Sequence, residues 1–292
     1  FFGLLFVGFV VYSPTGLVGV WRRFTEPMRP KVIEAAAMAG RTIEQGLPLP
    51  AFLHHEQTGD PSVLEARDLA KTFGGIQAVV DAAFVVQPRT LHALIGPNGA
   101  GKTTVFNLIT GMFAPDRGSV LLAGRSIARL PPYRIAAAGL GRSFQITNLF
   151  PRLSIAENLR LAVQVHDASH FNGWGDAQRN EPVTVRTTEL IRFLGLSGIE
   201  HAEAGSLSYG GQRLLDMGLA LAGAPRVLLL DEPLAGLAAR ERERVAGLIK
   251  RISADLPVLL VEHDIDRVFA LADRVTVMNE GNVLVDGTAS DA

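Results

Sequence analysis

The sequence contains no cysteine. Disulfide bonds, cysteine-ligated metals and thiol catalysis are therefore excluded, and a reducing compartment is favoured. An excess of either charge is also lacking, because 28 basic and 29 acidic residues leave a formal net charge of −1. That balance argues against a nucleic-acid partner. The 292 residues, of which 48% are hydrophobic, suffice for one large or two ordinary domains with a substantial core.

Lysine is scarce, and one lysine stands in a distinctive context. The four lysines are Lys31, Lys71, Lys102 and Lys250. Lys102 belongs to the run Gly96-Pro97-Asn98-Gly99-Ala100-Gly101-Lys102-Thr103-Thr104, which fits the pattern of a phosphate-binding loop. The apolar run Leu91–Ile95 before it predicts a strand, and Thr104–Thr110 after it predicts a helix. We expect the loop to cradle a nucleotide, with Lys102 on the β- and γ-phosphates and Thr103 on Mg²⁺.

A second candidate site lies where an apolar run meets two carboxylates. Val227–Leu230 predicts a buried central strand, and Asp231-Glu232-Pro233 follows it directly. At the carboxyl end of such a strand, Asp231 would hold the Mg²⁺ shell and Glu232 would polarise an attacking water. The alternative is a pair of acidic side chains in solvent.

A third element is the run Leu207-Ser208-Tyr209-Gly210-Gly211-Gln212-Arg213, which precedes the amphipathic stretch Leu214–Leu221. A serine and glycines at a helix start leave N–H groups free for a phosphate, and we expect Ser208 and Gly210 to bind one. The alternative is an ordinary N-capped helix. The chain has one nucleotide loop and one further helix start that could bind a phosphate. This combination indicates that a second subunit completes the site.

The N-terminal stretch has a different character. Phe1 to Trp21 carries no charge, and its length just reaches the roughly 20 apolar residues that a membrane helix needs. Ser13-Pro14-Thr15-Gly16 interrupts it, and Arg22-Arg23 follows, which favours the cytoplasmic side for the chain beyond. We expect residues 1–23 to be the end of a transmembrane segment, with a buried apolar helix as the alternative.

Residues 24–61 read as a proline-punctuated linker, and residues 62–292 as a compact α/β domain with a mostly parallel sheet. Within the linker, His54, His55 and Glu56 are either exposed to solvent or form a metal site. Solvent exposure is favoured, because neighbouring side chains on a loop rarely form a metal site by themselves. The expected strands are Val63–Phe73 and Ala78–Val86 in an antiparallel layer, then Gly118–Leu122, Pro257–Val261, Val275–Met278 and Val283–Val285. The expected helices are Pro132–Ala138, those of the stretch from Ser154 to about Ala222, and Ala238–Ile252.

The order of these motifs resembles the ATPase domain of ABC transporters, over roughly residues 62 to 288. The resemblance implies a P-loop fold with a parallel core, an antiparallel β layer and a helical subdomain at about residues 146–222. It also implies that Phe73 stacks on adenine and that His263 contacts the γ-phosphate. By the same resemblance, Gln145 senses the γ-phosphate, joins Thr103 and Asp231 at the metal, and couples the site to a permease. The implied ligands are ATP and Mg²⁺.

Shorter runs look like the ATPases of branched-chain amino acid importers. They are Phe73-Gly74-Gly75, Phe144-Gln145, Leu149-Phe150-Pro151, Leu207-Ser208-Tyr209-Gly210, Asp231-Glu232-Pro233 and Ala235-Gly236-Leu237. Ser13–Leu17 looks like the end of the matching permease, so the chain is similar to a permease–ATPase fusion cut inside its membrane part.

The resemblance implies a second ABC ATPase subunit (as a homo- or heterodimer), a transmembrane permease and, indirectly, a periplasmic solute-binding protein. It places the domain on the cytoplasmic face of the bacterial inner membrane. Two departures stand out: Gly211 replaces a glutamine, and Ala238 replaces the usual Asn or Asp. A soluble ABC-type ATPase serving ribosomes or DNA repair, or a P-loop kinase, are the alternatives.

Overall fold

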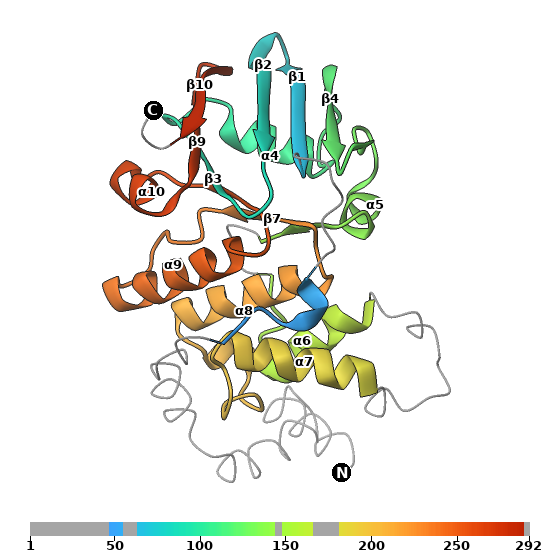
Figure 1. Ribbon diagram of the computed structural model, residues 1–292, viewed down its shortest axis with the longest axis vertical. Coiled ribbons are helices and arrows are strands. Elements are labelled where there is room, and N and C mark those ends of the chain that lie inside the picture. The colour runs from blue at the N-terminus through green and yellow to red at the C-terminus, as the bar shows by residue number, and fades with distance from the viewer. Residues whose placement is uncertain (1–46, 55–62, 144–147, 166–180, 289–292) are drawn as a thin grey trace, which may run out of the picture.

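The computed structural model describes residues 47–54, 63–143, 148–165 and 181–288 (Figure 1). Within them, ten strands form one sheet in the order β5-β4-β1-β2-β10-β9-β3-β8-β7-β6. The strands are β1 (Leu64–Phe73), β2 (Ile76–Val86), β3 (Leu91–Ile95), β4 (Arg117–Leu122), β5 (Arg125–Ser126), β6 (Leu140–Arg142), β7 (Val227–Asp231), β8 (Val258–Val261), β9 (Arg274–Asn279) and β10 (Asn282–Thr288). The helices are α4 (Lys102–Ile109), α5 (Pro132–Ala137), α6 (Ile155–Val165), α7 (Glu181–Phe193), α8 (Tyr209–Ala222), α9 (Ala239–Ser253) and α10 (Ile265–Leu271), with 3-10 turns η2 (Ala51–Leu53) and η4 (Ala204–Ser206).

The antiparallel layer that the sequence predicts is confirmed. β1 pairs antiparallel with both β2 and β4. Gly74 and Gly75 turn the chain between β1 and β2 with positive φ angles, which glycine adopts without steric cost. Burial on these two strands alternates over much of their length, because one face of the layer packs inward and the other stays open.

The centre of the sheet is parallel, as predicted: β3 pairs parallel with β8 and β9, and β7 pairs parallel with β8 and β6. All residues of β3, β7 and β8 are buried, which fits strands covered on both faces. Leu94, Val261 and Asp231 stand in one row across β3, β8 and β7. The loops after these three strands therefore leave the sheet at the same edge, and this edge carries the site.

The stretch predicted to be mainly helical forms α6, α7 and α8, which lie at the opposite end of the molecule from β1, β2 and β4 (Figure 1). The predicted helix start at Ser154 is present as a capping box. The backbone N–H of Ser154 donates to the Glu157 carboxylate at 2.7 Å, and the N–H of Glu157 donates to the Ser154 hydroxyl at 3.1 Å.

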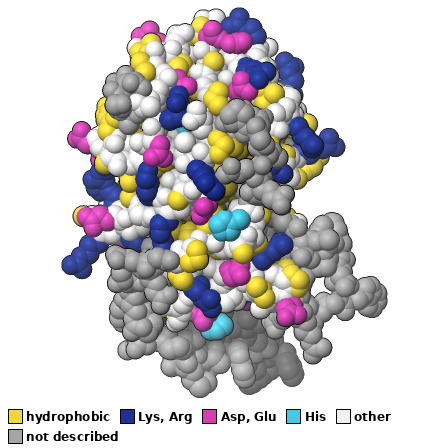
Figure 2. Space-filling view, viewed as in Figure 1, with side chains coloured by type: hydrophobic (Ala, Val, Ile, Leu, Met, Phe, Trp, Pro, Cys, Tyr) yellow, Lys and Arg dark blue, Asp and Glu magenta, His cyan; other side chains and the backbone are white. Residues whose placement is uncertain are grey.

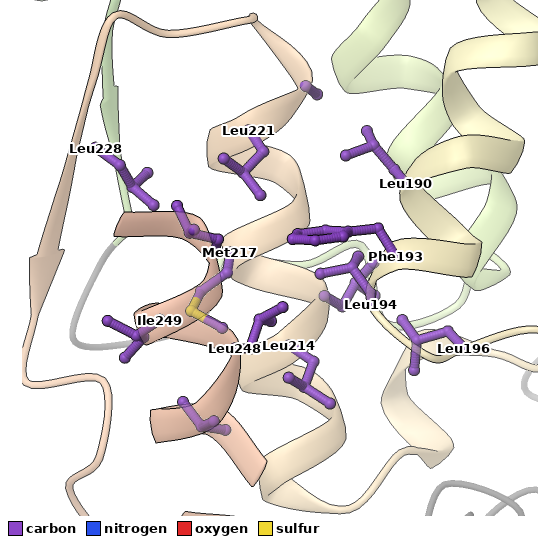
Figure 3. Packing of buried hydrophobic residues seen from close by; sticks show 14 of the residues in the cluster. Leu190, Phe193, Leu194, Leu196, Leu214, Met217, Leu221, Leu228, Leu248 and Ile249 are labelled. Carbon is purple, nitrogen blue, oxygen red and sulfur yellow. The ribbon is translucent and has the colours of Figure 1, made fainter. Parts of the chain in front are cut away.

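A buried apolar cluster joins this helical region to the sheet (Figure 3). Leu214, Met217 and Leu221 on α8 lie between the α7 side of the cluster and the α9 side. The residues labelled around them are Leu190, Phe193, Leu194 and Leu196 on one side, and Leu228, Leu248 and Ile249 on the other. Each such buried side chain contributes roughly 1.5–3 kcal/mol to folding, so α8 is held firmly against both α7 and α9.

Part of the predicted linker packs against the same cluster. Leu49 and Leu53 are buried members of it, and the Arg186 guanidinium of α7 lies 5.6 Å from the centre of the Phe52 ring. His54 bonds the Leu49 carbonyl, 3.2 Å away, while His55 and Glu56 lie outside the described residues. The expected transmembrane segment, 1–23, also lies outside them. No helix in the described part is both long and apolar enough to cross a bilayer.

Three of the strands and α-helices were not predicted from the sequence: β5, β6 and α10. β6 is three residues long and contains a glycine, so only its pairing with β7 makes it a strand. α10 is short and is started by the Asp264 side chain, which accepts the N–H of Arg267. On the face shown in Figure 2, basic and acidic side chains are interspersed, in line with the near-zero net charge.

Candidate functional site

The loop between β3 and α4 has the conformation that a phosphate cradle requires. Gly96, Gly99 and Gly101 all have positive φ angles, of 148°, 85° and 99°. A Cβ at Gly96 would lie 2.1 Å from the Met278 carbonyl oxygen, and one at Gly101 would lie 2.5 Å from that of Ala78. Glycine is therefore required at these two positions by both conformation and space.

The Lys102 ammonium points back into this loop. Its Nζ donates to the carbonyl oxygens of Gly96 at 2.7 Å and Pro97 at 2.9 Å. Burial lowers the pKa of Lys102, and the Glu232 carboxylate acts in the opposite direction. The cation is therefore held at the mouth of the loop by two carbonyls that a phosphate oxygen could replace.

Asp231 is the last residue of β7, the strand that pairs with β8, and Glu232 follows it. Asp231 is 6% exposed, and burial raises the pKa of its carboxyl, while Arg142 beside it acts in the opposite direction. The Arg142 guanidinium approaches Asp231 at 3.4 Å and donates to Asn107 at 3.0 Å and Thr110 at 2.7 Å. This arginine, which sequence reasoning passed over, links the Asp231 carboxylate to α4.

Glu232 adopts an unusual backbone conformation, with φ 48°, and its N–H donates to the Val261 carbonyl at 2.9 Å. A non-glycine residue in this region carries strain on the order of 1 kcal/mol or more, which the surrounding contacts must offset. His263 Nε2 is within hydrogen-bonding contact of a Glu232 carboxylate oxygen. The structure thus brings the predicted base and the predicted switch histidine together.

The donor set suits Mg²⁺. Thr103, in the first turn of α4, has an exposed side chain, and Asp231 supplies a buried carboxylate. Hydroxyl and carboxylate oxygens are ligands that this hard cation prefers. Gln145, the third predicted ligand, lies outside the described residues, although β6 runs to Arg142 just before it.

The predicted adenine platform stands at the end of β1. The Phe73 ring is 40% exposed and meets Phe113 edge-on, with 5.2 Å between ring centres. Asp116 holds the strand end in place, since its carboxylate accepts from Lys71 Nζ at 2.7 Å and from the Thr72 N–H at 2.8 Å. An exposed, braced aromatic face is suited to stacking on a nucleotide base.

Ser208 and Gly210 open α8, as predicted. The Ser208 hydroxyl accepts the N–H of Gly211 at 3.2 Å, so this serine is also the N-cap that the simpler interpretation required. A Cβ on Gly210 would lie 2.7 Å from Glu241 of α9, which explains the glycine. Among the described residues, no hydrogen bond joins Ser208 or Gly210 to the phosphate loop.

Comparison with known proteins agrees with this geometry. The family model described as ABC transporter matches residues 79–235. The high-affinity branched-chain amino acid transport ATP-binding protein BraF of Pseudomonas aeruginosa is 36% identical over 233 residues, covering 77% of this chain and 91% of that protein. LivG of Escherichia coli K12, of the same description, is 36% identical over 235 residues, with 77% and 91% covered.

Other relatives differ in the solute that they are named for. The ribose import ATP-binding protein RbsA 2 of Rubrobacter xylanophilus is 34% identical over 235 residues, covering 80% of this chain and 44% of that protein. Among solved structures, the ADP conformation of an ATP-binding cassette of an ABC transporter matches with TM-score 0.70 at 28% identity, covering 78% of this chain and 91% of that one. A nucleotide-free cassette gives 0.69 at 26% identity, with the same coverage.

Proposed function

Because the chain belongs to the ABC transporter family, we propose that it is the ATP-hydrolysing subunit of an importer for branched-chain amino acids or related small polar solutes. One observation carries the chemistry: the ends of β3, β8 and β7 present Lys102, His263 and Glu232 at a single edge of the sheet. The relatives named for branched-chain amino acids support the solute, since the match spans 91% of their length.

Hydrolysis is an in-line attack of water on the γ-phosphorus. The Glu232 carboxylate orients the water and accepts its proton, while His263 holds that carboxylate and faces the γ-phosphate. Lys102 leaves its two loop carbonyls to balance the charge on the β- and γ-phosphate oxygens. Such catalysis consists mainly of positioning and charge stabilisation.

Thr103 and Asp231, with Gln145, would hold Mg²⁺, which neutralises charge on the phosphates when bound. The adenine stacks on Phe73. Burial keeps the Asp231 carboxylate away from competing water, and Arg142 keeps it oriented.

A second ABC ATPase subunit, which we take to be a second copy of the chain, completes each site. Its Ser208 hydroxyl and Gly210 N–H meet the γ-phosphate bound by the first copy's loop. The chain's own α8 start makes no hydrogen bond to its own phosphate loop in the described residues, which supports this arrangement.

Closure of such a dimer acts on a permease at the cytoplasmic face of the membrane, and a periplasmic solute-binding protein delivers the solute. We further propose that residues 1–23 are the end of a permease segment fused to the ATPase, on the strength of their uncharged run and the Arg22-Arg23 pair that follows.

The experiment compares the wild type with Glu232→Gln and Lys102→Ala, in purified protein and in cells that carry the complete transport system. Glu232→Gln should lower turnover at least about 100-fold and leave Mg·ATP affinity within about threefold, because only the base is lost. Lys102→Ala should weaken Mg·ATP binding itself. Both variants should abolish uptake of radiolabelled leucine.

Unchanged turnover in Glu232→Gln would refute the assignment of the base. If the two variants lose ATP turnover but cells that carry them still take up leucine at the wild-type rate, the chain is an ATPase with no role in transport.

A further inference from the structure

A buried carboxylate beside the site has no role in the chemistry described so far. Glu262 follows β8 directly and precedes His263, and its side chain is 6% exposed. Its Oε1 accepts the backbone N–H of Leu234 at 2.9 Å. Its Oε2 lies 3.4 Å from the backbone N–H of His263, a longer and weaker hydrogen bond.

These bonds connect the two segments that carry the reacting groups. Leu234 stands two residues after Glu232, in the loop between β7 and α9. The Glu232 side chain contacts His263, and the Glu262 side chain reaches back from the His263 segment to the Glu232 loop. Together with the backbone between them, the two contacts form a closed ring, so a shift of one segment relative to the other lengthens at least one contact.

From this ring we propose that Glu262 is a positioning residue for ATP hydrolysis. It holds the loop after Glu232 so that the Glu232 carboxylate stays on His263, and this contact with His263 keeps the carboxylate in line with the attacking water. The inference depends on the proposed function of this same edge of the sheet.

The local backbone explains why such a clamp is needed. Glu232 has a φ of 48°, in the left-handed region, and its strain must be offset by neighbouring contacts. Contacts that hold this turn include the N–H of Glu232 on Val261, the N–H of Ala235 on the Glu232 carbonyl at 3.2 Å, and the bond from the Leu234 N–H to Glu262. The bond to Glu262 comes from a side chain of the neighbouring β8 segment, and Leu234, whose N–H it accepts, is only 5% exposed.

Glutamate meets this task better than its neutral analogues. Two backbone N–H groups face its two carboxylate oxygens, so both oxygens act as acceptors. Glutamine would keep an acceptor for the shorter bond but would turn its amide N–H₂ toward the other donor. Alanine would leave the Leu234 N–H buried without an acceptor.

The test measures kcat and KM for Mg·ATP in Glu262→Ala and Glu262→Gln. We expect Glu262→Ala to lower kcat about 10- to 100-fold, the worth of a buried hydrogen bond to a charged group, with KM within about threefold. Glu262→Gln should recover most of that loss, because it retains the acceptor for Leu234.

A matched control separates positioning from general loss of stability. The Asp273 carboxylate also accepts a strand-end backbone N–H, from Leu91 at 2.8 Å, but it lies at the amino end of β3, away from the site. Asp273→Ala should lower the thermal midpoint of unfolding and leave kcat for the folded protein within about threefold.

A double-mutant cycle with His263→Ala tests the route of the effect. If Glu262 acts by keeping Glu232 on His263, Glu262→Ala should lower kcat less than about threefold once His263 is absent. If Glu262→Ala lowers kcat by the same factor with and without His263, the inference is overturned. It is also overturned if Glu262→Ala has the same kcat as Asp273→Ala. If the wild type turns over no ATP, the proposed function fails; if it turns over ATP and Glu262→Ala is as active as Asp273→Ala, only the present inference fails.

Discussion

The loop after Glu232 ends at a helix that lacks a cap, and this yields a quantitative prediction. Ala238 is the N-cap residue of α9, with φ −63° and ψ 156°, and it makes no side-chain capping hydrogen bond. These are the angles at which Asp can accept the N–H of the second or third helical residue. Ala238→Asp should therefore stabilise the protein.

The magnitude follows from two contributions. A side-chain N-cap is worth about 1 kcal/mol relative to alanine, within a range of roughly 0.5–2. A negative charge at the positive end of the helix dipole adds about 0.3–1 kcal/mol. For a domain of roughly 150–250 residues, about 1 kcal/mol shifts the midpoint by about 2–4 °C, so a sum of about 1.3–2 kcal/mol should raise it by about 3–8 °C.

The assay is thermal unfolding of the nucleotide-free protein followed by circular dichroism. Ala239→Asp serves as the control, because its carboxylate has the same charge near the same helix end but sits one residue inside, where it cannot cap. It should give less than half of the rise. An unchanged midpoint in Ala238→Asp, or an equal rise in both variants, would refute the capping argument.

Two further predictions concern the sheet and the phosphate loop. Gly96→Ala should weaken Mg·ATP binding at least about tenfold, because its Cβ would lie 2.1 Å from a carbonyl oxygen of β9. The Cβ of Gly99→Ala meets no atom within 4 Å, so this control should lower the affinity less. Isothermal titration calorimetry measures both affinities. Burial lowers the pKa of His92 to about 4, against the charge of Asp286. Since an unfolded histidine titrates near 6.5, protons bind the unfolded chain first, and stability should fall by on the order of 3 kcal/mol as pH drops from 6.5 to 4. By urea unfolding, the wild type should be about 2 kcal/mol less stable at pH 5 than at pH 7, and His92→Gln should show a smaller difference.

Sequence reasoning succeeded where a motif fixes both the residues and their backbone. Gly96 and Gly101 of the phosphate loop adopt positive φ angles, which glycine tolerates, and the buried run before Asp231 predicts a central strand. Even there a boundary moved: α4 begins at Lys102, two residues before the predicted start, directly after Gly101 in the left-handed conformation.

What the sequence could not predict depends on contacts between distant segments. β6 is a strand because it pairs with β7, and its three residues show no strand pattern in the sequence. Arg142 reaches Asp231 across 89 positions, and Glu262 reaches Leu234 across 28. The one available signal for Glu262 was its place, an acidic residue between a buried strand and His263, and that pattern alone does not reveal which N–H it accepts.

The central claim is that each ATP is held between the Lys102 loop of one copy and the Ser208 helix of another. Mixing two inactive variants tests it most directly. Lys102→Ala and Ser208→Arg each spoil both sites of a homodimer, but a mixed dimer regains one site in which both elements are intact. The account predicts that an equal mixture recovers about a quarter of wild-type ATP turnover by random pairing. A mixture no more active than the two variants measured apart would contradict it.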